Sequence, residues 1–202
     1  MLYFIRRFIV WVRRARYSRG FGVQSPWAYR FIRYVVNEHY PYYKYEQLDK
    51  QVNRIDRRTR KLCKLYFRLS NYQQPHTFVD CYPASSCYKT YVTAGCQKAR
   101  YYKVTKETTE EKILQIFSNV GEYSIVRVLL IENYRLLIDK ALDYLSSTCV
   151  LVIENIKRDK EAKAYWAELV SDTRTGISFD LYYCGVLFLN RDMVKQSYVV
   201  NF

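Results

Sequence analysis

The sequence has few of the residues that build metal sites. It contains only two histidines, His39 and His76, and its six cysteines form no CxxC pair. Structural zinc sites need closely spaced cysteine and histidine ligands, so no metal site is expected. Several cysteines lie in apolar runs typical of strands, where a reduced, buried thiol is the usual outcome. We therefore predict a reducing, cytoplasmic location.

Long hydrophobic runs are also missing. The apolar stretch over residues 2–17 is interrupted by arginines and lacks a small-residue cleavage site, which argues against a secretory signal peptide. The stretch is too short and too charged to span a bilayer, so no transmembrane segment is expected. A place at the periphery of a membrane stays open, because the same stretch is amphipathic.

Acidic residues are scarce in the first third of the chain. Residues 1–70 hold 17 of the 33 lysines and arginines but only four of the 19 acidic residues, a balance of +13. Residues 71–202 are nearly neutral, with a balance of +1. This asymmetry predicts a basic helical N-terminal extension over residues 1–72 and an α/β domain over residues 73–202.

Three helices are predicted in the basic part. Over residues 2–17, apolar side chains fall on one broad side and four arginines on the other. Ser25 and Pro26 are a start signal for a second helix, which reaches about Glu38. Apolar residues at helical spacing predict one long third helix over residues 44–69, with a basic outer face.

From residue 77 the pattern alternates between strands and helices. Strands are predicted over residues 77–81, 101–105, 124–131 and 149–153, and helices over residues 85–97, 110–119, 135–145 and 159–170. Unbroken apolar runs suit strands that are covered on both faces, as in a parallel sheet between helix layers. Three closely linked segments, 176–183, 185–190 and 196–202, predict antiparallel pairing. The expected fold is α/β, a mostly parallel sheet that ends in an antiparallel meander.

Four collinear segments carry a resemblance to a known family. They are Arg19-Gly20-Phe21-Gly22-Val23-Gln24-Ser25-Pro26-Trp27-Ala28-Tyr29, Ile153-Glu154-Asn155-Ile156 with Trp166, Asp180-Leu181-Tyr182-Tyr183-Cys184-Gly185-Val186-Leu187-Phe188, and Lys195-Gln196-Ser197-Tyr198. The first is similar to His-Gly-Val-His-Ser-Pro-Phe-Val-Tyr, a signature of class I S-adenosylmethionine-dependent methyltransferase-like proteins of Bacteroidetes. The resemblance implies a Rossmann-like methyltransferase fold and S-adenosylmethionine as the cofactor.

The chain departs from that family at the cofactor loop. The resemblance implies an acidic residue at the end of the first strand, followed by a glycine-rich turn. Asp80 supplies the acid, but Tyr82 and Ser86 stand where the family has glycine, and Pro83 removes a backbone donor. Glycine is needed there because the backbone bends sharply and approaches the cofactor closely. These departures favour a chain that binds no cofactor.

The remaining family sites are altered as well. Glu107 is the one nearby candidate for gripping the ribose hydroxyls after the second strand. The family's acidic and histidine groups after the later strands correspond to Glu132 and to the pair Glu154 and Asn155, which are candidate catalytic residues. The segment 112–124 is too short for the extra strand that the family places there, so an edge strand should be missing.

Three functions fit these patterns. The favoured one is a degenerate methyltransferase-like protein without efficient methyl transfer, which acts through self-association or a protein partner at its basic N-terminal helices. The second is an active methyltransferase that uses Asp80 and Glu107 for the cofactor and Glu132 or Glu154 near the acceptor. The third is a basic module that binds RNA or an anionic membrane surface. A plainer reading has the apolar side of the first helix packed on the sheet.

Overall fold

The computed structural model describes residues 2–16, 22–38, 40, 42–52, 55–131 and 133–202. Its helical elements, in chain order, are α1 (Leu2–Arg14), α2 (Pro26–Phe31) continuing into the π-helix η2 (Ile32–Val36), α3 (Tyr43–Gln51), α4 (Arg57–Gln73), α5 (Cys87–Gly95), α6 (Glu110–Ser118), α7 (Tyr134–Tyr144) and α8 (Lys160–Ser171). The strands are β1 (Thr77–Cys81), β2 (Arg100–Val104), β3 (Ile125–Leu129), β4 (Val150–Glu154), β5 (Ser178–Asp180), β6 (Cys184–Phe188) and β7 (Ser197–Val199).

The strands form one seven-stranded sheet in the order β2-β1-β3-β4-β6-β5-β7. The first four strands pair in parallel, and β6 pairs antiparallel with both β4 and β5. The predicted α/β fold, mostly parallel with antiparallel strands near its C-terminal end, is confirmed. The meander is wrong in one respect, because β7 pairs in parallel with β5. The link from β6 to β7 passes across β5, so the short spacing did not imply direct pairing.

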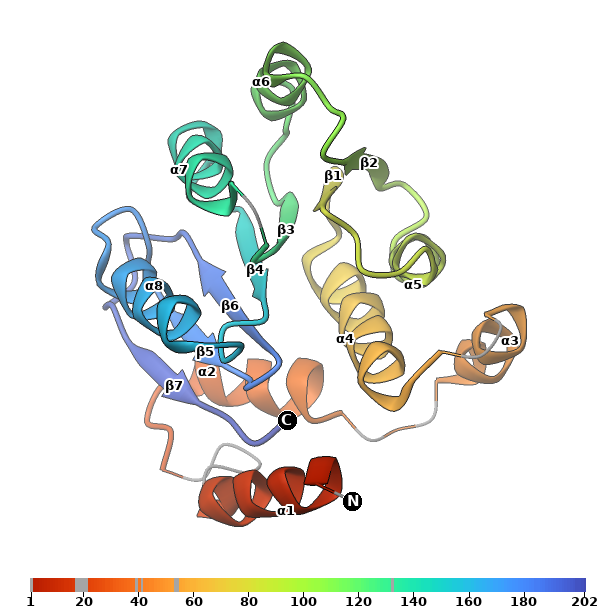
Figure 1. Cartoon of the computed structure of the whole chain (residues 1–202), viewed down its shortest axis with the longest axis vertical. Helices are drawn as coiled ribbons and strands as arrows, with labels where there is room; N and C mark the ends of the chain where they lie inside the picture. Colours follow the sequence, from red (N-terminus) through yellow and green to blue (C-terminus); the bar gives the residue numbers. More distant parts are fainter. Residues whose placement is uncertain (1, 17–21, 39, 41, 53–54, 132) are drawn as a thin grey trace.

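Two layers of helices enclose the sheet (Figure 1). Helices α2 to α5 share one hydrophobic cluster with one face of the sheet. Helices α6 to α8 share a second cluster with the opposite face. Side chains alternate between the two clusters along each strand, as in β1, where Phe78 joins the first and Val79 the second. The helices of residues 26–73 thus pack on the same sheet as the rest of the chain, and the boundary at residue 72 stays a prediction.

The predicted long third helix is two helices. Asp56 begins α4 by accepting hydrogen bonds from the backbone nitrogens of Arg58 (2.7 Å) and Thr59 (3.1 Å). An aspartate with extended backbone is a strong N-cap, and it starts a new helix even within a continuous helical apolar pattern. The second helix begins as predicted, because Ser25 Oγ accepts from the nitrogen of Ala28 at 3.3 Å.

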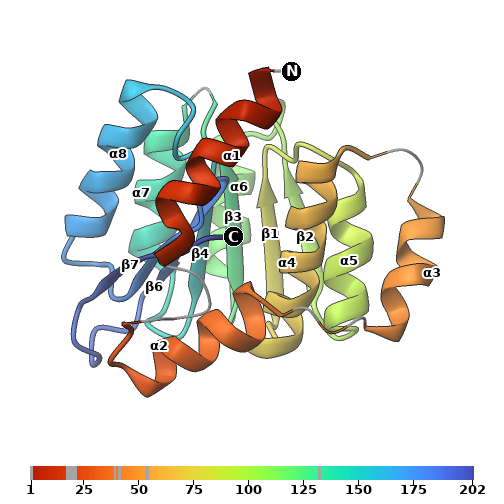
Figure 2. The same ribbon diagram turned by 90° about the horizontal axis from the view of Figure 1, so that it is seen from below.

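The sheet lacks an edge strand beyond β2 in the described part of the chain. After β2, helix α6 leads directly to β3, which lies on the other side of β1. Figure 2 shows this arrangement, with β2 at the edge of the sheet beside α5. The prediction that residues 112–124 leave no room for another strand is confirmed for these described residues.

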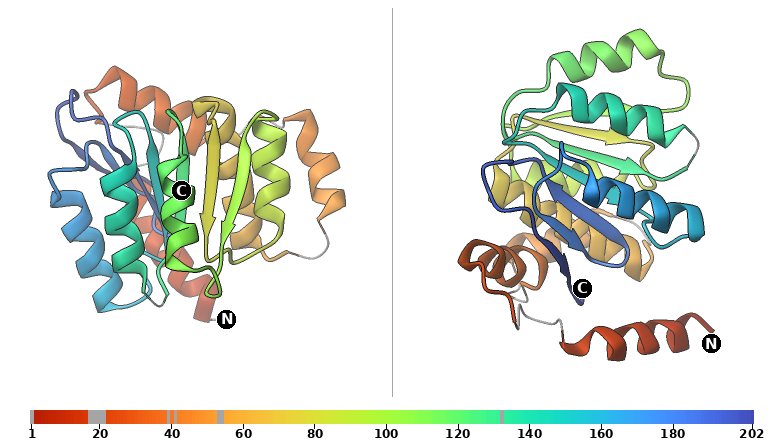
Figure 3. Two further views of the ribbon diagram at one scale, coloured as in Figure 1. Left: turned by 90° about the horizontal axis from the view of Figure 1, so that it is seen from above. Right: turned by 90° about the vertical axis from the view of Figure 1, so that its left-hand side faces the viewer.

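Helix α1 is the outermost element of the molecule (Figure 3). It lies across the end of the domain that carries β7 and the C-terminus. Its apolar side chains Ile5, Phe8, Ile9 and Val12 are 43–65% exposed, so they do not pack on the sheet. Within the described residues, no helix is long and apolar enough to cross a bilayer.

Candidate functional site

The carboxyl ends of the parallel strands meet at one edge of the sheet, where open α/β proteins bind their ligands. Strands β1, β3 and β4 run in the same direction. Strand β5 joins them, because β6 is antiparallel to both β4 and β5. Three carboxylates therefore end their strands at this edge: Asp80 on β1, Glu154 on β4 and Asp180 on β5.

An arginine inside the sheet joins the first two carboxylates. Arg127, in the middle of β3, is completely buried. Its Nη1 atom lies 2.8 Å from Asp80 Oδ1 and its Nε atom lies 2.9 Å from Glu154 Oε1. The strand order explains this contact, because β3 runs between β1 and β4. Both carboxylates are at most 1% exposed, so they face Arg127 rather than solvent.

Tyrosines complete the hydrogen bonding of this buried group. Tyr66 on α4 and Tyr101 on β2 donate their hydroxyls to Glu154 and Asp80, respectively. Tyr88 on α5 lies under the arginine, with its ring centroid 5.0 Å from the guanidinium carbon. The Nη2 atom of Arg127 has no hydrogen-bond partner among the described residues, and this cation–π contact stands in its place. We call Asp80, Arg127 and Glu154 the buried triad.

The pKa values of the two triad carboxylates shift in opposite directions. Burial raises the pKa of Asp80, and Arg127 offsets that effect only in part. Burial also acts to raise the pKa of Glu154, but the charge and hydrogen bond of Arg127 and the hydroxyl of Tyr66 outweigh it, and the net pKa is lowered. Arg127 contacts both carboxylates, and burial makes Asp80 the one that takes up a proton more readily.

The third carboxylate is also paired. Asp180 Oδ1 lies 2.9 Å from Arg14 Nη2, and its Oδ2 lies 2.7 Å from Lys157 Nζ. Arg14 Nη1 also donates to the carbonyls of Asp180 (3.0 Å) and Val200 (3.2 Å). Burial alone would raise the pKa of Asp180, but Arg14 and Lys157 lower it. Asp180 thereby anchors α1 to the sheet edge.

Left-handed backbone gathers at this same edge. Tyr82, Asn133 and Asn155 follow β1, β3 and β4, and their φ angles are 56°, 53° and 68°. At Tyr82 the turn that would favour glycine is therefore made by a bulky residue, which costs about 1–2 kcal/mol. The side chain of Tyr82 packs against the second hydrophobic cluster and thereby holds the turn in place.

The described residues that were predicted for the site do not all gather in one place. Asp80 and Glu154 come together, but only through Arg127. Asn155 accepts a hydrogen bond from Arg58 of α4. Ser86 is exposed at the start of α5, where its side chain caps nothing. Glu107 is exposed just beyond β2, and Glu132 lies outside the described residues.

The described residues at this edge give little support for a reactive cysteine or a metal site. No group of three His, Cys, Asp or Glu residues that could hold a metal occurs among the described residues. Burial raises the pKa of the Cys81 thiol, which disfavours the nucleophilic thiolate. Cys63 and Cys87 lie with sulfurs 3.0 Å apart between α4 and α5. The hydrogen bond between them lowers the pKa of Cys87 to about 7, although Cys87 is only 4% exposed.

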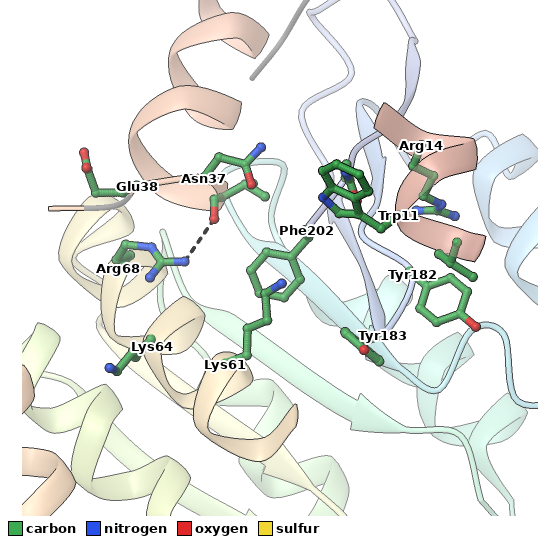
Figure 4. Close-up of a pocket in the computed structure, with 13 residues that line it drawn as sticks. Trp11, Arg14, Asn37, Glu38, Lys61, Lys64, Arg68, Tyr182, Tyr183 and Phe202 are labelled. Carbon is green, nitrogen blue, oxygen red and sulfur yellow. Dashed lines mark hydrogen bonds between the residues drawn. The ribbon is translucent and has the colours of Figure 1, made fainter. Parts of the chain in front are cut away.

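A pocket of about 690 Å³ opens beside the sheet edge, between α1, the end of η2, α4 and the C-terminal residues (Figure 4). Its cationic and aromatic lining residues are Arg14, Lys61, Lys64, Arg68, Trp11, Tyr182, Tyr183 and Phe202. The cations already have contacts within the protein: Arg68 donates to the carbonyls of Val35 and Val36, and Lys61 Nζ lies 4.4 Å from the ring centroid of Phe202. The pocket is a basic, aromatic recess, and Glu38 is the one acidic residue among its described lining residues.

Sequence reasoning missed the residue that organises the edge. Arg127 stands in the apolar run Ile125-Val126-Arg127-Val128-Leu129, and a single charge inside a buried strand must be paired. That signal predicts a buried partner, although it does not say which carboxylate. Arg58 and the tyrosines of α4 and α5 carried no comparable signal, because their contacts depend on how the helices pack.

No protein-family model matches the chain, and no curated protein matches it by sequence. Solved structures do match. The O-methyltransferase from Bacillus cereus, in complex with SAH, has a TM-score of 0.50 and 11% identity, over 76% of this chain and 94% of its own. A methyltransferase from Geobacter sulfurreducens has a TM-score of 0.50 and 12% identity, over 72% of this chain and 85% of its own.

The MycE methyltransferase of the mycinamycin biosynthetic pathway, in complex with Mg and SAH, matches over 73% of this chain at 10% identity, with a TM-score of 0.49. The match covers 49% of the MycE chain, so this protein spans about half of its length. At such low identity, the two structures with a TM-score of 0.50 support an inference about the fold alone. The chain has a Rossmann-like methyltransferase fold.

Proposed function

We propose that this protein is a degenerate methyltransferase-like protein that keeps the fold without efficient methyl transfer and acts by binding partners at its surface. One observation carries the proposal: Arg127 is fully buried between Asp80 and Glu154. The carboxylates at the ends of β1 and β4 are the groups that would otherwise meet a cofactor or an acceptor. Both are engaged by the protein itself.

The energetics of the triad support this proposal. A ligand that took Glu154 away from Arg127 would break a buried ion pair, which costs about 3–5 kcal/mol. Any new hydrogen bond to a ribose hydroxyl is worth about 0.5–1.5 kcal/mol, or about 1.5–3 kcal/mol when the acceptor is charged. This exchange is unfavourable, which supports the proposal that Glu154 is not a cofactor ligand.

The loop after β1 supports the same conclusion. Tyr82 makes the left-handed turn without glycine and packs its ring against the core, and Pro83 has no N–H to offer. S-adenosylmethionine needs a close approach to the backbone at such a turn, which glycine permits. The residues of this loop therefore do not fit S-adenosylmethionine.

We assign the proposed surface binding to the basic N-terminal part of the chain. Its balance of +13 over residues 1–70 favours an anionic partner, and α1 exposes an apolar side. A partner-binding role needs no intact cofactor site. The resemblance to the Bacteroidetes proteins is compatible with this role.

Isothermal titration with S-adenosylmethionine and S-adenosylhomocysteine tests the proposal. We expect no saturable heat with either ligand. We also expect no rise in the thermal unfolding midpoint, since a ligand that binds only the folded state must raise it. The matched variants are Glu107→Ala and Glu122→Ala, which remove exposed carboxylates at opposite edges of the sheet.

Saturable binding of either ligand would contradict the proposal. If Glu107→Ala then weakened the binding and Glu122→Ala did not, the ligand would lie at the carboxyl edge. The second candidate function, an active methyltransferase, would then be favoured. The observation in its favour is that Glu107 stays exposed just beyond β2, beside the end of β1.

A further inference from the structure

Helix α1 packs on the domain with its polar side inward. Arg14 turns toward the sheet edge, where it is only 12% exposed and pairs with Asp180. Val10, one helical turn before it, lines the same pocket. Val12 lies two positions from both residues, which is about 200° around a helix at about 100° per residue. The side of α1 around Val12 therefore faces away from the domain.

The outward side of α1 is a continuous apolar stripe. Ile5, Phe8, Ile9 and Val12 follow one another at helical spacing and are 54%, 65%, 43% and 50% exposed. Trp11, 56% exposed, borders the stripe on the side of the basic pocket. In an ordinary surface helix this stripe would face the core, because exposed apolar surface is costly. Here the domain leaves Phe8 and Val12 uncovered, while Ile5 and Ile9 lie at the groove toward α8.

Basic residues flank the stripe. Arg13 is exposed at its edge, and Lys163 of α8 lines the groove that separates α8 from α1 together with Ile5 and Ile9. Lys157 lies in the same groove and pairs with Asp180. The views of Figure 3 show α1 as an outer layer, with α8 nearby on the same side of the sheet edge. Apolar and cationic groups are thus presented in one direction.

We propose that the outward side of α1 docks on the surface of an anionic lipid bilayer. A bilayer interface takes up an apolar helix side to a depth of about 5–10 Å while its anionic headgroups meet the flanking cations. The tryptophan at the border of the stripe suits the same interface, since its ring is amphipathic. The helix lies on the membrane and does not cross it.

The charge of the surface excludes the other occupants. A second copy of the chain would place the same stripe and the same arginines against each other, because a twofold interface brings identical patches together. The cations beside the stripe, Arg13 and Lys163, would then lie near those of the other copy, which disfavours this contact. The phosphates of a nucleic acid would pair with the cations, but the side chains of Phe8 and Val12 would stay in water. Of these occupants, only an anionic bilayer offers both an apolar layer for the stripe and negative charge for the flanking cations.

The inference names the partner for the surface role proposed above and rests on that role. Vesicle binding is measured apart from cofactor titration, so each can fail alone. The experiment is flotation of the full chain with vesicles of phosphatidylcholine, or of phosphatidylcholine mixed with phosphatidylserine. We expect the protein to float with the mixed vesicles and to stay behind with phosphatidylcholine alone, and we expect added salt to weaken binding.

Two variants separate the apolar stripe from a general effect of charge. Phe8→Glu combined with Val12→Glu removes two members of the stripe and should weaken binding by at least about tenfold, because the burial of both side chains is lost. Leu136→Glu is the matched control: Leu136 is 57% exposed on α7, on the opposite face of the sheet, and its replacement should change binding little. Arg13→Glu should weaken binding by about fivefold or more.

The outcomes are distinct. Flotation of the wild-type protein that is lost in the double variant and kept in Leu136→Glu supports the proposal. Absence of flotation with mixed vesicles, or equal flotation of the double variant, overturns it. Sedimentation equilibrium adds a check: if the wild type dimerises and the double variant does not, while neither floats, the stripe is a contact between copies. Equal circular dichroism spectra and unfolding midpoints show that the variants are folded.

Discussion

Helices α1 and α4 are both basic and amphipathic, yet their apolar sides end in opposite environments. Helix α4 buries Leu62, Leu65 and Leu69 against the sheet, at most 1% exposed, and turns basic residues outward. Helix α1 holds the sheet edge through Arg14 and turns Phe8 and Val12 outward. One helix is held by hydrophobic burial, and the other by an ion pair.

The difference shows that an amphipathic pattern predicts a contact for the apolar side of a helix. The pattern does not identify the surface that makes this contact. α4 leads directly into β1, so its apolar side faces the strand that follows. α1 is separated from α2 by the segment around residues 17–21, and Arg14 anchors it to the sheet edge through Asp180. The polar groups under α4 reinforce its position, since Tyr66 and Arg58 donate to Glu154 and Asn155 at the sheet edge.

The largest expected effect concerns the triad beneath α4. Arg127→Met removes the cation and leaves two carboxylates in a dry interior, which should cost about 3–5 kcal/mol of unfolding free energy. Urea unfolding followed by circular dichroism measures the loss. Adding Asp80→Asn and Glu154→Gln to this variant should recover much of it, because no buried charge then remains. A single variant as stable as the wild type would mean that the triad is not a paired charge cluster.

A direct comparison of the two helices gives the next effect. Leu65→Ala in α4 should destabilise the protein by about 2–5 kcal/mol, since it opens a cavity in a closely packed core. Phe8→Ala in α1 removes an even larger side chain but should change the unfolding free energy by no more than about 0.5 kcal/mol. The measurement is again urea unfolding. Similar losses in the two variants would mean that α1 packs on the domain by its apolar side.

A smaller effect is expected on the opposite face of the sheet. An alanine Cβ at Gly185 would lie 2.2 Å from the Trp166 ring, so Gly185→Ala forces the indole to move. We expect a loss of about 1–3 kcal/mol from overpacking. Thermal unfolding of this variant, compared with Gly185→Ala combined with Trp166→Leu, measures it. If the smaller side chain at position 166 rescued nothing, the contact would not be the cause.

The subtlest prediction concerns how α1 is held. The pKa of Asp180 is lowered by Arg14 and Lys157, so its stabilising contribution is present above its unfolded value of about 3.9 and is lost as pH falls through the folded pKa. Below about pH 4, the protection of the α1 amides, relative to their intrinsic exchange rate at the same pH, should fall, while that of the α4 amides is kept. Hydrogen exchange from neutral to acidic pH tests this.

Asp180→Asn is the control for the anchor of α1. The variant should release α1 at every pH and remove the acid dependence of the protection of the α1 amides. If α1 exchanged equally slowly in the variant and in the wild type, the ion pair would not be what holds the helix.

Most of the fold was predictable from local pattern. The apolar runs of β1, β3 and β4 and the helices between them fall where the spacing predicted, because buried parallel strands need unbroken apolar residues. Two errors share one cause. The break at Asp56 and the parallel pairing of β7 with β5 depend on where a chain segment lies in space, and spacing along the sequence does not report that.

The sequence by itself determined the alternation of strands and helices, the basic N-terminal part and the absence of glycine just after β1. These are local properties, set by side-chain periodicity, charge and backbone freedom. Only the tertiary structure decided that Arg127 would take both strand-end carboxylates and that α1 would turn its apolar side outward. Both outcomes depend on which strand lies between which neighbours and on where Asp180 meets Arg14, and such long-range contacts leave no periodic trace in the chain.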